Sequence, residues 1–131
     1  MNKNFIVPQW NAPANIQAIQ TTRNGGNSLN LFSSLNLSNK VGDNQKDVEI
    51  NQKKILNFLP ASPIWLNQIH SDITQELPAE GNLDCDASFT YKKKLVCAVR
   101  TADCLPILLT NREGSFVASI HSGWKSLGKG I

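Results

Sequence analysis

The sequence predicts an α+β fold, a mixed β-sheet with helices packed on it. Three observations lead to this prediction. The chain has 131 residues, enough for one domain with a single core. Only one long segment, residues 43–60, has a clear helical pattern. Residues 62–121 contain short apolar runs that turn residues separate. We therefore expect residues 1–131 to form a single domain.

The predicted helix is the segment DNQKDVEINQKKILNFLP. Asp43 is expected to cap its first turn by accepting a backbone N–H bond. Val48, Ile55 and Leu59 recur at helical spacing, so they share one face. Pro60 lacks the N–H group that a longer helix needs, and the helix is expected to end before it.

The rest of the chain predicts short strands and loops. Residues 15–26 are expected as a short strand that ends in a turn, and 27–42 as an ordered loop whose leucines pack. A turn is expected at REG, 112–114, and a helix in SGWKSLGKGI after residue 121. LVCAV and LPILL are apolar at successive positions, which predicts strands buried on both faces. The predicted strands are SPIWLNQIH (62–70), DITQEL (72–77), CDASFTY (85–91), KLVCAVRT (94–101), LPILLT (105–110) and SFVASIH (115–121).

Charge and cysteine content argue against several classes of protein. The formal net charge is only +3, without the concentrated basic face of a nucleic-acid binder. No stretch is long and apolar enough for a secretory signal or a transmembrane helix, so no membrane role is expected. Three cysteines without disulfide-type spacing indicate a reducing compartment, and a cytoplasmic protein is expected.

The candidate chemical centre consists of the two histidines and one cysteine. His70 and His121 end predicted strands, and Cys104 begins another. Their separations are too long for a zinc-finger loop, so only a folded sheet can bring them together. Two neutral imidazoles and a thiolate would give zinc three ligands and an open fourth position. Without metal, the same residues would form a Cys–His nucleophilic pair. Taken singly, each is more often structural, and spacing does not decide.

The other two cysteines are not expected to do chemistry. Cys97 lies in an apolar run and has the character of a small buried hydrophobic residue. Cys85 lies between Asp84 and Asp86, whose negative charges raise the pKa of a neighbouring thiol and leave it unreactive.

Six sequence motifs, taken together in their order along the chain, indicate a protein family. They are TTRNGG, SLNLSNKVGDN, LNQIHSD, DCDASFT, VRTADCLPILLTN and IHSGWKSLGKGI, and they span Thr21 to Ile131. Together they resemble the laccase-domain (YfiH-like) family, formerly called multicopper polyphenol oxidase and now associated with purine nucleoside phosphorylase activity.

The resemblance implies a site. His70, Cys104 and His121 match the family's zinc ligands, which surround the catalytic centre. Arg23 is our candidate for phosphate or ribose recognition, because a guanidinium group binds oxyanions in a bidentate manner. Lys125 stands where the family often has Arg, so a point charge replaces a planar fork. The residues implied in substrate binding are Arg23, Gln68, Asp103, Gly123 and Lys125.

The function that the resemblance implies is zinc-dependent phosphorolysis of purine nucleosides such as adenosine, inosine or methylthioadenosine. Adenosine deamination would also suit such a centre. Copper is less favoured, because a multicopper oxidase needs many more imidazoles than two. Two alternatives stay open: a metal-free hydrolase that uses Cys104 as nucleophile, and a non-enzymatic, zinc-stabilised binding fragment.

Members of the family are considerably longer than 131 residues, and this chain resembles their N-terminal half. The resemblance therefore implies a truncated version of the family fold. A truncated sheet would have an exposed edge and apolar surface, through which self-association is expected.

Overall fold

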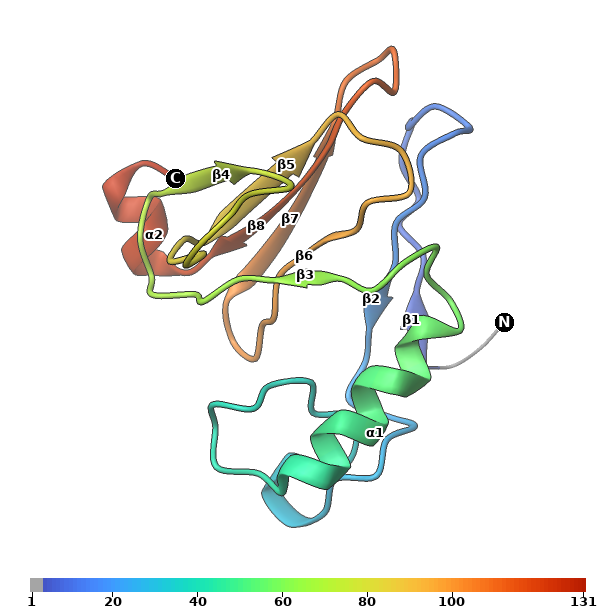
Figure 1. Ribbon diagram of the computed structural model, residues 1–131, viewed down its shortest axis with the longest axis vertical. Coiled ribbons are helices and arrows are strands. Elements are labelled where there is room, and N and C mark those ends of the chain that lie inside the picture. Colours follow the sequence, from blue (N-terminus) through green and yellow to red (C-terminus); the bar gives the residue numbers. More distant parts are fainter. Residues whose placement is uncertain (1–3) are drawn as a thin grey trace. The chain divides into compact units, whose positions relative to one another are not determined.

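The computed structural model describes residues 4–131, which form two compact units (Figure 1). The first unit contains the described residues up to Trp10 together with Gln17–Leu59. The second contains Asn11–Ile16 and Pro60–Ile131, and it carries most of the strands. Helices and sheets together form a mixed architecture of the predicted class.

The first unit is built around one helix and little sheet. Its strands form a short antiparallel pair in which Phe5 lies opposite Thr21. The strand predicted over 15–26 is thus confirmed only at its centre, while the loop predicted over 27–42 is ordered and contains a 3₁₀ turn. Leu35 is buried as expected, but packing of Leu29 and Leu31 was a wrong prediction, since they are 69% and 89% exposed. The elements are β1 (Phe5–Ile6), β2 (Gln20–Thr21), η1 (Asn30–Phe32) and α1 (Gln45–Leu56).

The predicted helix is confirmed as α1, but the predicted cap is wrong by one residue. Asn44 is the N-cap, and its side chain accepts from backbone N–H groups of the first turn. The carboxylate of Asp43 instead accepts from the Ser28 hydroxyl at 2.6 Å and from the Asn36 amide at 2.9 Å. Because the preceding loop already supplies these donors, the capping role falls to the next residue.

The predicted apolar face of α1 is present over most of its length. Val48 and Ile55 are buried, as the helical spacing predicted. The helix ends at Leu56, before Pro60 as expected, so Leu59 lies beyond it in the following turn.

A buried amide joins α1 to the loop before it. The Asn51 side chain accepts from the Asn27 N–H group at 2.7 Å. It donates to the Ser28 hydroxyl and to the carbonyls of Ser34 and Asn36, at 2.9 to 3.1 Å. These bonds satisfy polar groups of the loop that have no hydrogen-bond partner in a sheet. This explains why the polar loop is ordered.

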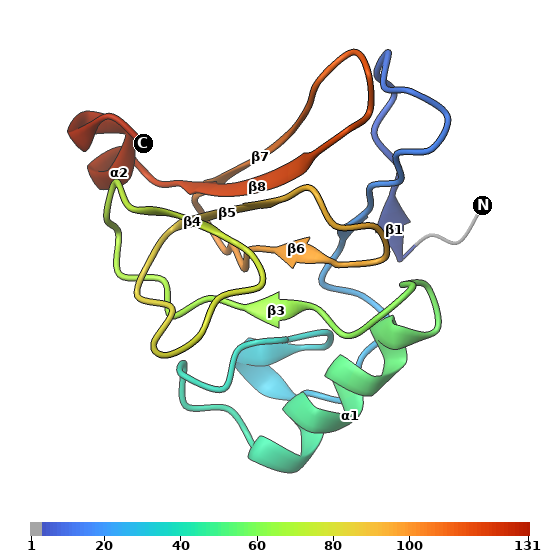
Figure 2. The same ribbon diagram turned by 45° about the horizontal axis from the view of Figure 1, so that its top comes forward.

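The second unit contains a mixed sheet, as predicted, and a separate pair of short strands (Figures 1 and 2). The strand order of the main sheet is β4-β5-β8-β7. β4 and β5 are parallel, whereas the other neighbours are antiparallel. β3 pairs with β6 in parallel. The elements are β3 (Ile64–Trp65), β4 (Thr74–Glu76), β5 (Ala87–Thr90), β6 (Cys97–Ala98), β7 (Leu105–Thr110), β8 (Val117–Ser122) and α2 (Trp124–Lys129).

All six predicted strands are present, but the runs 62–70 and 94–101 each contribute only two residues to a sheet. Burial of LVCAV on both faces was a wrong prediction, since these residues are half-buried. The run 62–70 contributes only β3 to a sheet. At its end, the N–H groups of Ile69, His70 and Ser71 all donate to the carboxylate of Asp86. These groups are therefore unavailable to a strand ladder, and the chain turns where a longer strand was expected.

β7 and β8 form a hairpin whose turn lies at the predicted place. The N–H group of Gly114 donates to the carbonyl of Asn111, and Gly114 has a φ of 63°, which glycine adopts without strain. Burial of β7 on both faces was a wrong prediction, since Leu105 is 63% and Leu109 45% exposed. Their strand lies at the edge of the described sheet. Self-association through this edge stays a prediction.

The helix expected after His121 is confirmed as α2, which begins at Trp124 and ends before Gly130. Gly130 adopts the left-handed conformation typical of a helix C-terminus, with a φ of 97°. Within residues 4–131, no helix has the length and apolar character that a membrane crossing requires.

Candidate metal centre

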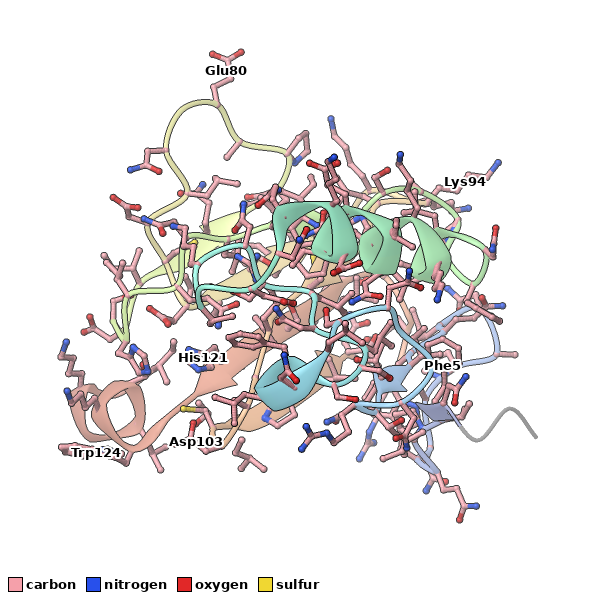
Figure 3. All side chains as sticks on the ribbon, turned by 90° about the horizontal axis from the view of Figure 1, so that it is seen from below. Phe5, Glu80, Lys94, Asp103, His121 and Trp124 are labelled. Carbon is pink, nitrogen blue, oxygen red and sulfur yellow. The ribbon has the colours of Figure 1, made fainter. Side chains whose placement is uncertain are left out.

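Three side chains from separate segments of the second unit converge. One potential ligand atom from each of His70, Cys104 and His121 lies within 4.8 Å of the other two. Cys104 directly precedes β7 and His121 lies near the end of β8, where Pro106 is its partner. The hairpin register therefore places the thiol and the imidazole at one end of the sheet, as expected from their positions at strand ends. Figure 3 shows His121 there with Asp103, the residue before Cys104.

A buried aspartate fixes the imidazole of His121. Nδ1 of His121 lies 2.8 Å from Oδ1 of Asp86. A carboxylate accepts hydrogen bonds, so this contact assigns the proton of a neutral ring to Nδ1. Nε2 is then free of a proton and available to a metal, the arrangement common among metal-binding histidines.

The same carboxylate orders the segment that carries His70. It accepts from the backbone N–H groups of Ile69, His70 and Ser71 at 2.6 to 3.2 Å, and from the Ser71 hydroxyl at 2.7 Å. Burial alone would raise the pKa of Asp86, but the hydrogen bonds from His121 and from the 69–71 segment lower the pKa to about 2. Asp86 is thus a carboxylate at neutral pH.

His70 sits in an unusual backbone conformation. Its φ is 58°, in the left-handed region that non-glycine residues rarely adopt. Its ring centre lies 4.9 Å from that of His121, edge to face. Lys129 of α2 donates to the His70 carbonyl at 2.9 Å. Such a conformation persists where surrounding contacts hold it, and here they hold both peptide groups that flank the residue.

The thiol of Cys104 lies against the glycine that precedes α2. A Cβ atom on Gly123 would lie 2.7 Å from Sγ of Cys104 and 3.4 Å from Cδ2 of His70. Gly123 is therefore required for close packing of two potential ligands. Burial raises the pKa of the Cys104 thiol, and the neighbouring charges of Asp103 and Asp86 raise the pKa further. A cation beside the sulfur, either a metal ion or a protonated imidazole, would favour a thiolate here.

The residues that the resemblance implies in substrate binding have contacts of several kinds. Asp103, which directly precedes Cys104, is exposed (Figure 3). Lys125 is exposed as well, and its ammonium group lies 5.5 Å from the ring centre of Trp124. Gln68 donates to the Arg100 carbonyl at 2.7 Å and accepts from its N–H group at 2.8 Å. Those two bonds engage the Gln68 amide with main chain, and its role at substrate stays a prediction.

Arg23 belongs to the first unit, where its Nε donates to the carbonyl of Ser33 at 2.7 Å. This bond leaves the terminal nitrogens of an exposed guanidinium group for other contacts. Recognition of phosphate or ribose by Arg23 stays a prediction.

Of the other two cysteines, Cys85 is buried, whereas Cys97 is less buried than expected. Cys85 is buried, and burial, Asp86 and Asp84 together raise the pKa of its thiol. Cys97 is half-buried, and burial raises its pKa as well.

Asp86 is the residue that the sequence reasoning missed. In the sequence it appeared only as a charged neighbour of Cys85. A signal was available, because the DCDASFT block places this aspartate directly before a buried strand.

The sequence matches one family model over residues 17–131, described as multi-copper polyphenol oxidoreductase laccase. The chain belongs to this family. The resemblance found in the motifs is thereby confirmed.

Relatives of known name support the same assignment. The chain is 46% identical over 129 residues to a protein of Haemophilus influenzae named purine nucleoside phosphorylase, covering 96% of this chain and 53% of that protein. It is 44% identical over 131 residues to purine nucleoside phosphorylase YfiH of Escherichia coli K12, covering 97% and 54%. The chain thus spans about half the length of these relatives, consistent with the predicted truncated fold.

Solved structures share the fold. The crystal structure of Neisseria meningitidis protein NMB0706 matches with a TM-score of 0.89 and 44% identity, over 98% of this chain and 54% of that one. YlmD from Geobacillus stearothermophilus matches with a TM-score of 0.80 and 29% identity, over 90% of this chain and 49% of that one.

Proposed function

We propose that this chain carries the metal centre of a zinc-dependent purine nucleoside phosphorylase. The observation that carries the proposal is the convergence of His70, Cys104 and His121, whose ligand atoms lie within 4.8 Å of one another. The names of relatives at 44–46% identity, both called purine nucleoside phosphorylases, support the reaction. We further propose residues 1–131 as the N-terminal portion of one such domain, acting in the cytoplasm.

The donor set fits zinc better than copper. One sulfur and two imidazole nitrogens are usual ligands of a catalytic zinc ion, which keeps a fourth position open. The carboxylate of Asp86 keeps the ring of His121 in the tautomer that a metal requires. Within the described residues the group holds two imidazoles, and the whole sequence has no third histidine for a copper cluster.

In phosphorolysis, a phosphate oxygen forms a bond to C1′ of the ribose while the bond from C1′ to the purine nitrogen breaks. The purine leaves with the bond's electron pair and needs a proton. A bound zinc ion would supply Lewis acidity beside this reaction. Asp103, directly before Cys104, and Lys125, in the first turn of α2, are both exposed and are our candidates for contacts to the nucleoside and the phosphate. Arg23 is the candidate for a bidentate phosphate contact.

The proposal is tested by phosphate-dependent release of free purine from inosine and adenosine. The assay compares the 131-residue chain with any longer natural chain that contains it, before and after chelation. Cys104→Ser is expected to abolish turnover and zinc binding, whereas Cys97→Ser, on a half-buried strand position, is expected to keep both. Undiminished phosphorolysis after chelation would overturn the zinc proposal.

The same experiment separates the alternatives. A metal-free hydrolase would retain activity after chelation and lose it when Cys104 is alkylated. A zinc-stabilised binding fragment would unfold on chelation without turning over any nucleoside. Ammonia released from adenosine without phosphate would indicate deamination.

A further inference from the structure

We propose that Asp86 is the positioning residue of the metal centre: its one carboxylate sets the tautomer of His121 and also holds the backbone turn that presents His70. The inference rests on the metal site of the proposed function. It concerns a residue that makes no contact with substrate in the account above, so its effect is exerted through the two histidines.

The two oxygens of Asp86 have different tasks. Oδ1 accepts from Nδ1 of His121 at 2.8 Å and from the N–H group of His70 at 3.0 Å. Oδ2 accepts from the N–H groups of Ile69 and Ser71 and from the Ser71 hydroxyl. A single side chain that is 0% exposed therefore bonds to two of the three potential ligand residues.

None of these bonds uses a metal-binding atom. The bond to His121 engages Nδ1 and leaves Nε2, while the bond to His70 engages only main chain. His70 has a φ of 58°, and three successive N–H groups directed at one carboxylate maintain that turn. Asp86 thus positions His70 through its backbone, whereas it holds the imidazole of His121 directly at Nδ1.

The position of Asp86 relative to β8 comes from the sheet itself. Asp86 directly precedes β5, and its carbonyl accepts from the His121 N–H group at 2.7 Å. Main chain and side chain of the same residue thus both bond to His121. A rotation or shift of this pair of strands would separate the carboxylate from the ring, so the register of β5 and β8 determines the geometry.

The isosteric change Asp86→Asn makes a specific prediction. An asparagine side chain has only one accepting oxygen. We expect this oxygen to take the place of Oδ2, where it accepts from the N–H groups of Ile69 and Ser71 and from the Ser71 hydroxyl. The amide nitrogen then faces Nδ1 of His121 and donates to it, which moves the ring proton to Nε2. The metal-binding nitrogen becomes blocked although the side chain keeps its shape. The same amide nitrogen replaces the oxygen that accepts from the His70 N–H group, so the variant removes that bond as well.

Two readouts test the proposal without enzyme activity. Nitrogen-15 NMR of the metal-free protein reports which imidazole nitrogen of His121 carries the proton. We expect Nδ1 in the wild type and Nε2 in Asp86→Asn. Competition with a chromophoric zinc chelator measures affinity, and Asp86→Asn is expected to bind zinc 10- to 100-fold more weakly, about the range for lost outer-shell partners.

Ser71→Ala is the matched control. It removes one neutral donor to Oδ2 and leaves the bond from Asp86 to His121 intact. A merely structural role for the carboxylate would make both variants lose stability without moving the His121 proton. We expect Ser71→Ala to retain the Nδ1 proton and zinc affinity within about threefold of the wild type, a change smaller than the loss of an outer-shell partner.

The outcomes are distinguishable. If wild-type protein binds no zinc, the proposed metal site fails and the assignment of Asp86 fails with it. If the wild type binds zinc and folded Asp86→Asn binds it equally well, only the assignment of Asp86 is overturned. Should Asp86→Asn not fold, the wild type alone decides, because a proton on Nε2 in the metal-free protein would overturn the inference.

Discussion

Replacement of Gly123 by alanine tests how closely the potential ligands of the metal centre pack. Gly123 has a φ of −72° and a ψ of 160°, which any residue adopts, so alanine brings no backbone strain. Its added Cβ would lie 2.7 Å from Sγ of Cys104 and 3.4 Å from Cδ2 of His70. The perturbation is therefore a single methyl group directed at two potential ligands.

The size of the effect follows from these distances. Ordinary carbon contacts begin at about 3.5 Å, so the sulfur must move by about 0.8 Å or more to accommodate the methyl group. Metal–ligand distances tolerate only about 0.2 Å. The thiol of Cys104 is then displaced from a position that serves zinc. We expect zinc affinity to fall about 100-fold or more, which corresponds to about 3 kcal/mol.

Gly128→Ala is the control within α2. A Cβ at Gly128 would meet nothing within 4 Å, and the residue lies inside the helix. It should leave zinc affinity unchanged and stabilise the fold by about 0.5–1 kcal/mol, because glycine disfavours helices. Competition with a chromophoric chelator measures affinity, and thermal unfolding of the metal-free proteins checks folding. Wild-type zinc affinity in folded Gly123→Ala would refute the reasoning.

Three further predictions concern stability, each measured by urea unfolding. The lowered pKa of Asp86, about 2 against an ordinary 3.8, means that its contribution is present above pH 4 and is lost as pH falls towards 2. At about 1.4 kcal/mol per tenfold change, the metal-free protein should lose about 2 kcal/mol over that range, and Asp86→Asn should not show this loss. Asn51→Leu leaves buried loop groups without partners and should cost about 3 kcal/mol or more, against about 0.5 kcal/mol for exposed Gln45→Leu. Leu66→Ala, at a fully buried site, should cost about 2–5 kcal/mol, whereas a loss as small as that of exposed Leu127→Ala would contradict the core assignment.

The three potential ligands could be proposed from sequence because they stand at or near the ends of predicted strands. Cys104 directly precedes β7, His121 lies near the end of β8, and the turn at 112–114 fixes which residues of this hairpin pair. Spacing alone left their convergence open, since a shift of one residue in register would have turned one side chain to the other face. The family motifs supplied what the spacing lacked.

Asp86 was missed because its importance is not local. Along the chain it neighbours Cys85, and the charge effect on that thiol was the visible consequence. Its contacts to His121 and to the 69–71 segment depend on the pairing of β5 with β8 and on a turn that ends β3 early. Such contacts arise only from the tertiary fold.

The errors in the fold have the same origin. The cap of α1 moved from Asp43 to Asn44 because loop residues far from the helix start occupied the carboxylate. The faces of β7 were expected to be buried, yet strand order placed β7 at an edge and exposed Leu105. Local pattern specified which segments form strands, while their order decided which faces are covered.

The arrangement of the centre links metal binding to folding of the second unit. Its three potential ligands come from a loop after β3, from the start of β7 and from β8, so no unfolded chain holds them together. Zinc would then bind the folded state preferentially and stabilise it in proportion to the logarithm of its concentration over the dissociation constant. The cross-links among these segments already exist without metal: Asp86 bonds to two of them, and Gly123 packs against the thiol of the other. A metal ion would therefore bind to a largely formed site. Less of its binding free energy would be offset by the cost of ordering the ligands than in a zinc finger, where the fold forms only with the metal.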